Sequence, residues 1–154
     1  MRELAGQGID VLGVDAVPGR VEAARETGGG RFATMDHAGV AAGDLDAQAD
    51  TVVCNFSLFC GTPAEHLLAA MPRLPVPGGA VVIQTPHPWS AVGDEDYRDG
   101  WRAGSWAGWR RIFLAAGLTL REVVEPLPPQ TGRPASILFT LAIDDPAAPA
   151  PPHR

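Results

Sequence analysis

The chain has 154 residues, a length sufficient for one domain with a sizeable core. Of these residues, 45% are hydrophobic and 19% are charged. Its formal net charge of −6 argues against a nucleic-acid backbone or an anionic membrane as the main partner. All 12 basic residues are arginines, so a Schiff-base lysine and a phosphate-loop lysine are excluded. No apolar run approaches the ~20 residues of a membrane helix. The sequence shows no signal peptide before Cys54 and Cys60. We therefore expect both cysteines to be free thiols in a cytoplasmic protein.

Apolar runs of strand length alternate with segments of helical character along most of the chain. The pattern predicts the end of a helix at 2–7, helices at 17–27, 62–71 and 106–116, and strands at 9–14, 31–35, 50–56, 80–85, 118–125 and 135–143. Alternation of strands and helices predicts an α/β fold with a mostly parallel sheet. The last two strands are joined without a crossover helix, so the final strand is expected to run antiparallel.

The segments between these elements carry further expectations. The stretch 40–48 is small, polar and rich in Ala and Gly, and it predicts a loop with one helical turn. Residues 76–79 predict a turn, and the strand at 80–85 is expected to be buried on both faces because no charge interrupts it. The Pro/Ala-rich residues 144–154 predict a disordered tail behind a domain at 1–143.

Asp15 is the first candidate for a functional role. It follows an apolar strand and precedes a helix that begins near Pro18. In dinucleotide-binding α/β units, a carboxylate at the tip of the second strand accepts hydrogen bonds from the ribose hydroxyls. An acid in this position can instead cap the following helix. Taken alone, the residues leave both interpretations open.

Five strings in order resemble those of class I S-adenosylmethionine-dependent methyltransferases. They are Val11-Leu12-Gly13-Val14-Asp15, Met35-Asp36-His37, the strand and exit at 50–56, the turn and strand at 74–83, and Ala116-Gly117-Leu118. The resemblance covers about residues 8–143. It implies a Rossmann-like fold whose sheet is mostly parallel with an antiparallel last strand, and S-adenosyl-L-methionine as the cofactor.

The resemblance also implies roles for individual residues at the cofactor. Asp15 would bind the ribose, with Ala16 beside the adenine as a small residue. Asp36 would accept from the adenine amino group and His37 would offer its backbone N–H, although a plain turn acid is the alternative for Asp36. The remaining cofactor candidates are Asn55 and Phe56, at the end of the strand at 50–56. For Phe56, packing in the core is the alternative.

His87 and several aromatic residues are candidates for the acceptor side. His87 follows the strand at 80–85 and can act as a base toward a substrate hydroxyl or amine, or serve as a structural residue between two prolines. Residues that can line a substrate pocket or cover the end of the sheet are Trp89, Tyr97, Trp101 and Trp106, whereas Trp109 has helical core spacing. Neither His66 nor His153 shares a metal-ligand spacing with a cysteine, and no metal site is predicted.

The chain departs from the family's pattern at its beginning. The first strand and its glycine-rich loop should lie about 20 residues before the ribose acid, but Asp15 has only 14 residues before it. Gly6-Gln7-Gly8 is interpreted as the stop of a helix. The resemblance thus implies that the chain begins inside its domain and lacks the central strand, between those ending at Asp15 and Asn55, so that cofactor binding and activity are weak or absent.

The expected function is methyl transfer from S-adenosylmethionine to an unidentified acceptor. It needs alignment of a nucleophile rather than a catalytic triad, and the sequence shows none. Three explanations for the missing segment are a true start upstream, a decayed remnant, or a shortened domain with another role. The alternative functions are a non-catalytic interaction domain that self-associates through a strand edge beside Val11 or Val53, and a nicotinamide-dependent oxidoreductase, which the lack of lysine disfavours.

Overall fold

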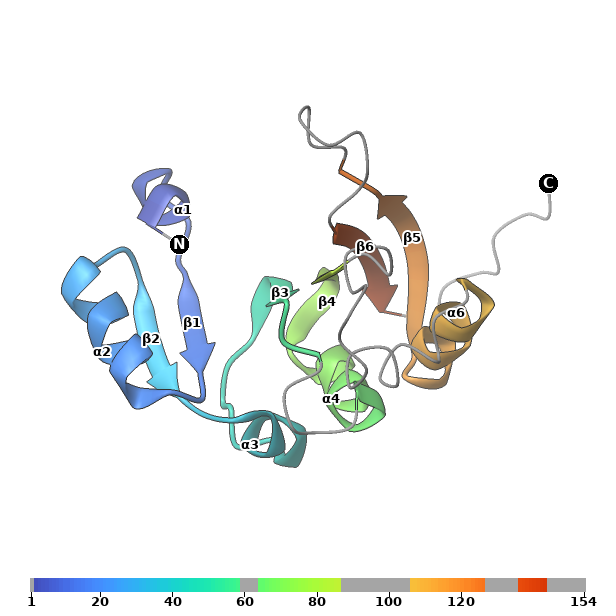
Figure 1. Ribbon diagram of the computed structural model, residues 1–154, viewed down its shortest axis with the longest axis horizontal. Coiled ribbons are helices and arrows are strands. Elements are labelled where there is room, and N and C mark those ends of the chain that lie inside the picture. The colour runs from blue at the N-terminus through green and yellow to red at the C-terminus, as the bar shows by residue number, and fades with distance from the viewer. Residues whose placement is uncertain (1, 59–63, 87–105, 127–135, 144–154) are drawn as a thin grey trace, which may run out of the picture. The chain divides into compact units, whose positions relative to one another are not determined.

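The computed structural model describes residues 2–58, 64–86, 106–126 and 136–143. The chain divides into two compact units, Met1–Leu45 and Asp46–Arg154, and each has a sheet of its own (Figure 1). The described residues include no helix long and apolar enough to cross a bilayer. The predicted tail at 144–154 lies outside them, and the domain limits of 1–143 stay a prediction.

The first unit is a two-stranded parallel sheet with one helix packed along it (Figure 1). Its elements are α1 (Arg2–Gly6), β1 (Leu12–Asp15), α2 (Pro18–Thr27), β2 (Arg31–Thr34) and α3 (His37–Ala42). The small core of the unit contains Val11 and Val21, which are 9% and 2% exposed. Because β1 and β2 are parallel, their carboxyl ends lie at the same edge, where Asp15 pairs in register with Thr34.

A glycine-rich connection joins α2 tightly to β2. Gly28 has a φ of 73° and its N–H donates to the carbonyls of Ala24 and Arg25, which ends the helix. Gly30 has a φ of 146°, and a Cβ built there would lie 2.6 Å from the Val11 carbonyl oxygen. Only glycine therefore fits at Gly30, where the chain passes closely under β1.

The second unit is a four-stranded mixed sheet in the order β3-β4-β6-β5. Its elements are β3 (Ala49–Asn55), α4 (Ala64–Ala70), the 3-10 helix η1 (Met71–Arg73), β4 (Pro75–Pro86), α6 (Trp106–Ala115), β5 (Leu118–Val124) and β6 (Ser136–Ile143). Strand β3 runs parallel to β4, and β6 runs antiparallel to both β4 and β5. The prediction of an antiparallel last strand is therefore confirmed.

One face of this sheet holds the core of the unit. Val81, Ile83 and Thr85 of β4 are fully buried there, and Trp109 of α6 is 3% exposed. The ring centroids of Trp109 and Phe113 lie 5.4 Å apart, and both rings pack against the buried ring of Phe139 on β6. Helix α4 contributes two further buried residues, Leu67 and Leu68. The core position of Trp109 agrees with its helical spacing.

Three local predictions need correction. Residues 80–85 are not buried on both faces, because Ala80, Val82 and Gln84 alternate with the buried residues and stay partly exposed. The turn predicted at 76–79 lies within β4, as a shift in the pairing with β3, and a Cβ at Gly79 would come within 2.8 Å of the Asp50 carbonyl oxygen. The first strand covers Leu12–Asp15 rather than 9–14.

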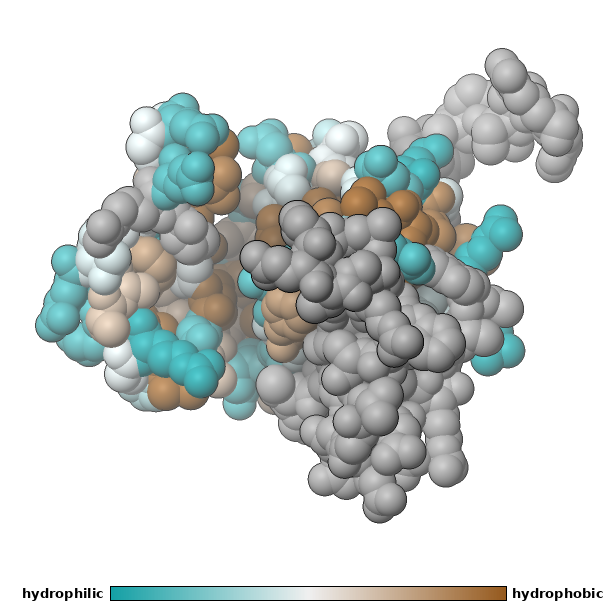
Figure 2. All heavy atoms as spheres, turned by 45° about the horizontal axis from the view of Figure 1, so that its top comes forward, coloured by the Kyte–Doolittle hydropathy of each residue, from teal (hydrophilic) through white to brown (hydrophobic). Residues whose placement is uncertain are grey.

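The outer edges of β1 and β3 pair with no other strand in the described residues. Val53 of β3 is 62% exposed, and Val14 of β1 is 36% exposed. Figure 2 shows hydrophobic side chains at the surface of the described residues, among hydrophilic ones. Unpaired edges of this kind are able to accept a further strand, and self-association through one of them stays a prediction.

Candidate functional site

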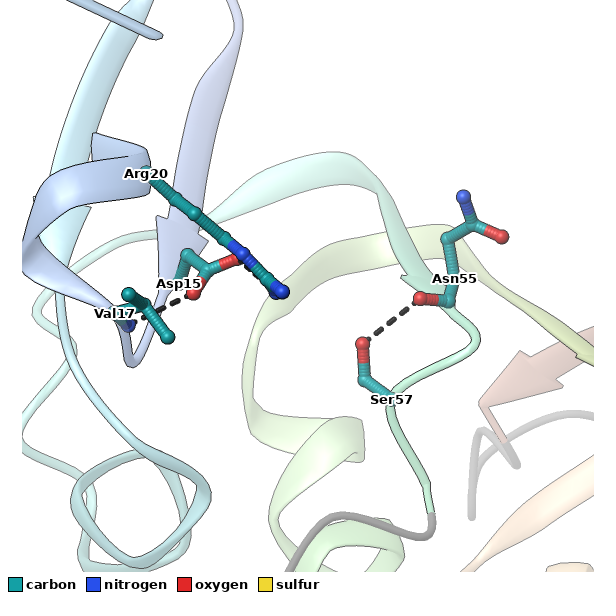
Figure 3. A network of polar contacts seen from close by, with 5 residues as sticks. All are labelled: Asp15, Val17, Arg20, Asn55 and Ser57. Carbon is teal, nitrogen blue, oxygen red and sulfur yellow. Dashed lines mark hydrogen bonds and ion pairs between the residues drawn. The ribbon is translucent and has the colours of Figure 1, made fainter. Parts of the chain in front are cut away.

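Asp15 sits at the carboxyl end of β1 with its carboxylate held in one orientation (Figure 3). Oδ1 accepts a hydrogen bond of 2.8 Å from the N–H of Val17, the residue that caps α2. Oδ2 lies 3.7 Å from Arg20 Nη1, an ion pair whose side chains are 40% and 74% exposed. An exposed ion pair contributes little free energy, so Oδ2 remains able to accept from a ligand hydroxyl.

Asp15 is not the N-cap of α2, because that position is held by Val17, which has no side-chain cap hydrogen bond. The hydrogen bond from the Val17 N–H holds the turn before the helix, and it uses one oxygen of Asp15 only. The second oxygen is the one that a ribose would engage. Arg20 was not predicted from the sequence as a site residue. It lies in the first turn of α2, and this places its guanidinium beside the Asp15 carboxylate. Ala16, between Asp15 and Val17, is exposed.

Asp36 and His37 begin α3 at the same edge of the first unit. The N–H of Met35 donates to the Asp15 carbonyl oxygen at 3.1 Å, which brings this segment beside β1. Asp36 is the N-cap of α3, and its Oδ1 accepts from the Gly39 N–H at 2.8 Å. His37 Nδ1 is buried and makes no hydrogen bond within the described residues. The stretch 40–48, expected to be a loop with one helical turn, begins within α3, which starts at His37 and ends at Ala42.

The exit of β3 in the second unit has an unusual backbone. Phe56 has a φ of 51°, in the left-handed region, and its N–H donates to the Gln84 carbonyl oxygen at 2.8 Å. Ser57 Oγ donates to the Asn55 carbonyl oxygen at 2.9 Å, while the Asn55 side chain points away from Ser57 (Figure 3). Phe56 is 45% exposed, so its ring is not part of the core, and the core-packing alternative is wrong.

Gln84 and Ser136 form a polar pair that sequence reasoning missed. Gln84 Nε2 donates to Ser136 Oγ at 3.2 Å, in a part-buried position. The two residues are 52 positions apart, and only the antiparallel pairing of β4 with β6 brings them together. A polar residue directly after the apolar run at 80–83 was the available signal for Gln84, but nothing in the sequence connects it to Ser136.

Within each unit, the structure brings the predicted residues together at the carboxyl ends of strands. Asp15, Ala16, Asp36 and His37 lie at one edge of the first unit, and Asn55 and Phe56 lie together at the exit of β3. Several predicted acceptor-side residues fall outside the described residues, namely His87, Trp89, Tyr97 and Trp101. The described residues contain no group of three His, Cys, Asp or Glu side chains able to hold a metal ion.

The comparisons with known proteins bear on the fold. No family model matches the sequence. No curated protein matches it either. A TehB-like SAM-dependent methyltransferase from Corynebacterium glutamicum matches with a TM-score of 0.68 and 20% identity, over 93% of this chain and 73% of that one.

Two further solved structures give the same picture. Magnesium protoporphyrin IX methyltransferase from Synechocystis, solved with bound SAH, matches with a TM-score of 0.67 and 18% identity over 93% of this chain and 68% of that one. The glycopeptide N-methyltransferase MtfA matches with a TM-score of 0.70 and 14% identity over 94% and 78%. The chain therefore has the Rossmann-like fold of class I S-adenosylmethionine-dependent methyltransferases.

Proposed function

We propose that this chain is an S-adenosylmethionine-dependent methyltransferase domain that binds the adenosine part of its cofactor. The observation that carries the proposal is the Asp15 carboxylate, which is fixed at the carboxyl end of β1 by the Val17 N–H and keeps Oδ2 accessible. In open α/β sheets, ligands bind at this end of the strands. The fold is one whose solved examples include proteins with SAM or SAH bound.

Each residue has a task that fits its surroundings. Asp15 accepts from the ribose hydroxyls, and displacement of the exposed Arg20 costs little. Ala16 leaves room for the adenine ring, and the segment at Asp36 and His37 contacts its polar edge. Asn55 and Phe56, exposed at the exit of β3, are assigned to the same cofactor. When bound, the cofactor supplies an electrophilic methyl group, and the protein aligns the acceptor and excludes water.

The affinity for the whole cofactor is expected to be low. The contacts proposed for Asp15, Ala16, Asp36 and His37 are all to the ribose and the adenine. A ligand held at one end gains only part of the free energy available to a fully contacted one. We also propose that the protein is cytoplasmic.

Calorimetric titration of S-adenosylhomocysteine into the full chain tests this function. Wild type is expected to bind in the high-micromolar range, and Asp15→Asn to bind about 10–100-fold more weakly, because hydrogen bonds to a charged group contribute about 1.5–3 kcal/mol. Asparagine keeps an oxygen that can accept from the Val17 N–H, so this variant removes the charge without removing this hydrogen bond.

Asp10→Asn is the matched control. Asp10 is an exposed acid of the same unit, 3.0 Å from Arg31, and its replacement is expected to leave the affinity within twofold of wild type. NAD⁺ titrated under the same conditions is expected to show no heat of binding. Equal affinities of wild type and Asp15→Asn, or tighter binding of NAD⁺ than of S-adenosylhomocysteine, would reject the proposed function.

A further inference from the structure

Three polar side chains occupy neighbouring positions on three adjacent strands of the second unit. Asn55 of β3 pairs in register with Gln84 of β4, and Gln84 pairs with Leu138 of β6. Ser136 stands two residues before Leu138, so it faces the same side of the sheet as Gln84. The hydrogen bond of 3.2 Å from Gln84 Nε2 to Ser136 Oγ confirms that these side chains meet. We call Asn55, Gln84 and Ser136 the polar row.

The polar row lies at the ends of apolar runs, next to the buried Thr85. Residues 80–83 of β4 and 137–139 of β6 are all apolar, and Ser136 is only 7% exposed. A buried hydroxyl and a part-buried amide lose hydration, and one shared hydrogen bond only partly restores it. Two apolar side chains of similar shape would hold the strands together at least as well. The pair therefore calls for a reason other than stability.

The pair keeps hydrogen-bonding groups available to a ligand. Because Gln84 donates through Nε2, its Oε1 remains an acceptor; because Ser136 receives that bond on Oγ, its hydroxyl hydrogen remains a donor. All three side chains of the polar row are uncharged. The bond to Ser136 also limits the rotation of the Gln84 amide, which prepares Oε1 for a partner in one direction.

We propose that Gln84, oriented by Ser136, accepts a hydrogen bond from an uncharged N–H or O–H group on the methyl acceptor. The assignment rests on the proposed function, because it uses the neighbouring Asn55 as a cofactor residue. Asn55 and Gln84 are register partners on neighbouring strands. The hydrogen-bonding group of the methyl acceptor would therefore lie one strand away from the cofactor, at the carboxyl ends of β3 and β4. Gln84 selects a nucleophile that carries a hydrogen, and Ser136 is a positioning residue.

Nuclear magnetic resonance of the ¹⁵N-labelled full chain with saturating S-adenosylhomocysteine tests the assignment. The chain contains four glutamines and one asparagine, so the side-chain amide signals are few, and loss of one signal in Gln84→Leu identifies Gln84. Phenol and aniline are the probes, with anisole and N,N-dimethylaniline as matched probes that lack the hydrogen. Phenol and aniline are expected to shift the Gln84 signal, and the matched probes to leave it in place.

The variants separate recognition from folding. Gln84→Leu is expected to weaken phenol binding about tenfold, followed through backbone amide shifts, with the affinity for S-adenosylhomocysteine within twofold of wild type. Ser136→Ala is expected to broaden the Gln84 amide signal and to weaken phenol binding severalfold. Gln48→Leu, at an exposed glutamine outside the sheet, is the control and is expected to change neither.

The outcomes distinguish the two proposals. Equal shifts from phenol and anisole, or phenol affinities in Gln84→Leu and Ser136→Ala equal to that of wild type, would overturn the assignment of the polar row while cofactor binding stands. Absence of S-adenosylhomocysteine binding to wild type would instead reject the proposed function itself, and the assignment of the polar row would fall with it.

Discussion

Replacement of Phe113 by alanine is expected to lower the free energy of unfolding by about 3–5 kcal/mol. The ring is fully buried and lies between Trp109, at 5.4 Å between centroids, and Phe139, at 5.2 Å. Truncation to alanine leaves a cavity at the contact between α6 and the sheet, and both aromatic neighbours lose packing. Urea unfolding followed by tryptophan fluorescence measures the loss, because Trp109 is itself one of the partners.

Leu114→Ala is the control for this prediction. Leu114 is the next residue of α6 and is 51% exposed, so its truncation is expected to cost less than about 1 kcal/mol. Equal losses in Phe113→Ala and Leu114→Ala would contradict the placement of the aromatic cluster against β6.

Gly30→Ala is expected to destabilise the first unit by about 3 kcal/mol. The residue has a φ of 146°, and the new Cβ would lie 2.6 Å from the carbonyl oxygen of Val11. That oxygen cannot move freely, because it accepts the Arg31 N–H at 2.8 Å and so starts the pairing of β1 with β2. Loss of this pairing would also displace the carboxyl ends of both strands, where Asp15 and Asp36 lie.

Two spectroscopic signals separate this effect from changes in the second unit. All four tryptophans lie at position 89 or later, so their fluorescence follows the second unit, whereas far-ultraviolet circular dichroism follows both. Gly30→Ala is expected to change the dichroism transition and leave the fluorescence transition in place. Gly19→Ala, at an α2 glycine with open space around it, is expected to cause no loss. A Gly30→Ala protein with unchanged dichroism would contradict the strained approach to β1.

Much of the fold was accessible from the sequence because its periodic signals are local. The helix expected at 17–27 and the one at 106–116 appear as α2 and α6, and the strand at 118–125 appears as β5. The signal failed where tertiary contacts decide. Residues 76–79 have the composition of a turn, yet they extend β4, because pairing with β3 outweighs local preference.

The sequence did not predict that α3 begins at His37, for a similar reason. The presence of Gly39 within 37–42 favours a loop, since glycine in a helix is unfavourable. The structure shows what compensates for it: Asp36 caps the helix through the Gly39 N–H, and a Cβ at Gly39 would lie 2.8 Å from Met35 Cγ. A larger residue there would force Met35 to shift, and this contact cannot be seen in the local sequence pattern.

The candidate site was predictable in part. Asp15 carries a recognisable pattern, a carboxylate between a strand and a helix, and the structure adds that one of its oxygens is already bonded to Val17. Gln84 and Ser136 were not predictable as a pair, because their meeting depends on the register of β4 with β6. The position of Arg20 was not predictable either, because its ion pair with Asp15 depends on the orientation of α2 relative to β1.

The central claim is that the adenosine part of the cofactor binds at Asp15, at the carboxyl ends of β1 and β2. Its most direct test is a titration of the ¹⁵N-labelled full chain with S-adenosylhomocysteine, followed through the backbone amide signals. The largest shifts are predicted for residues 15–17, 36–37 and 55–57, with the signals of β5 and α6 unmoved. Shifts confined to other residues, or no shift at millimolar ligand, would contradict the claim.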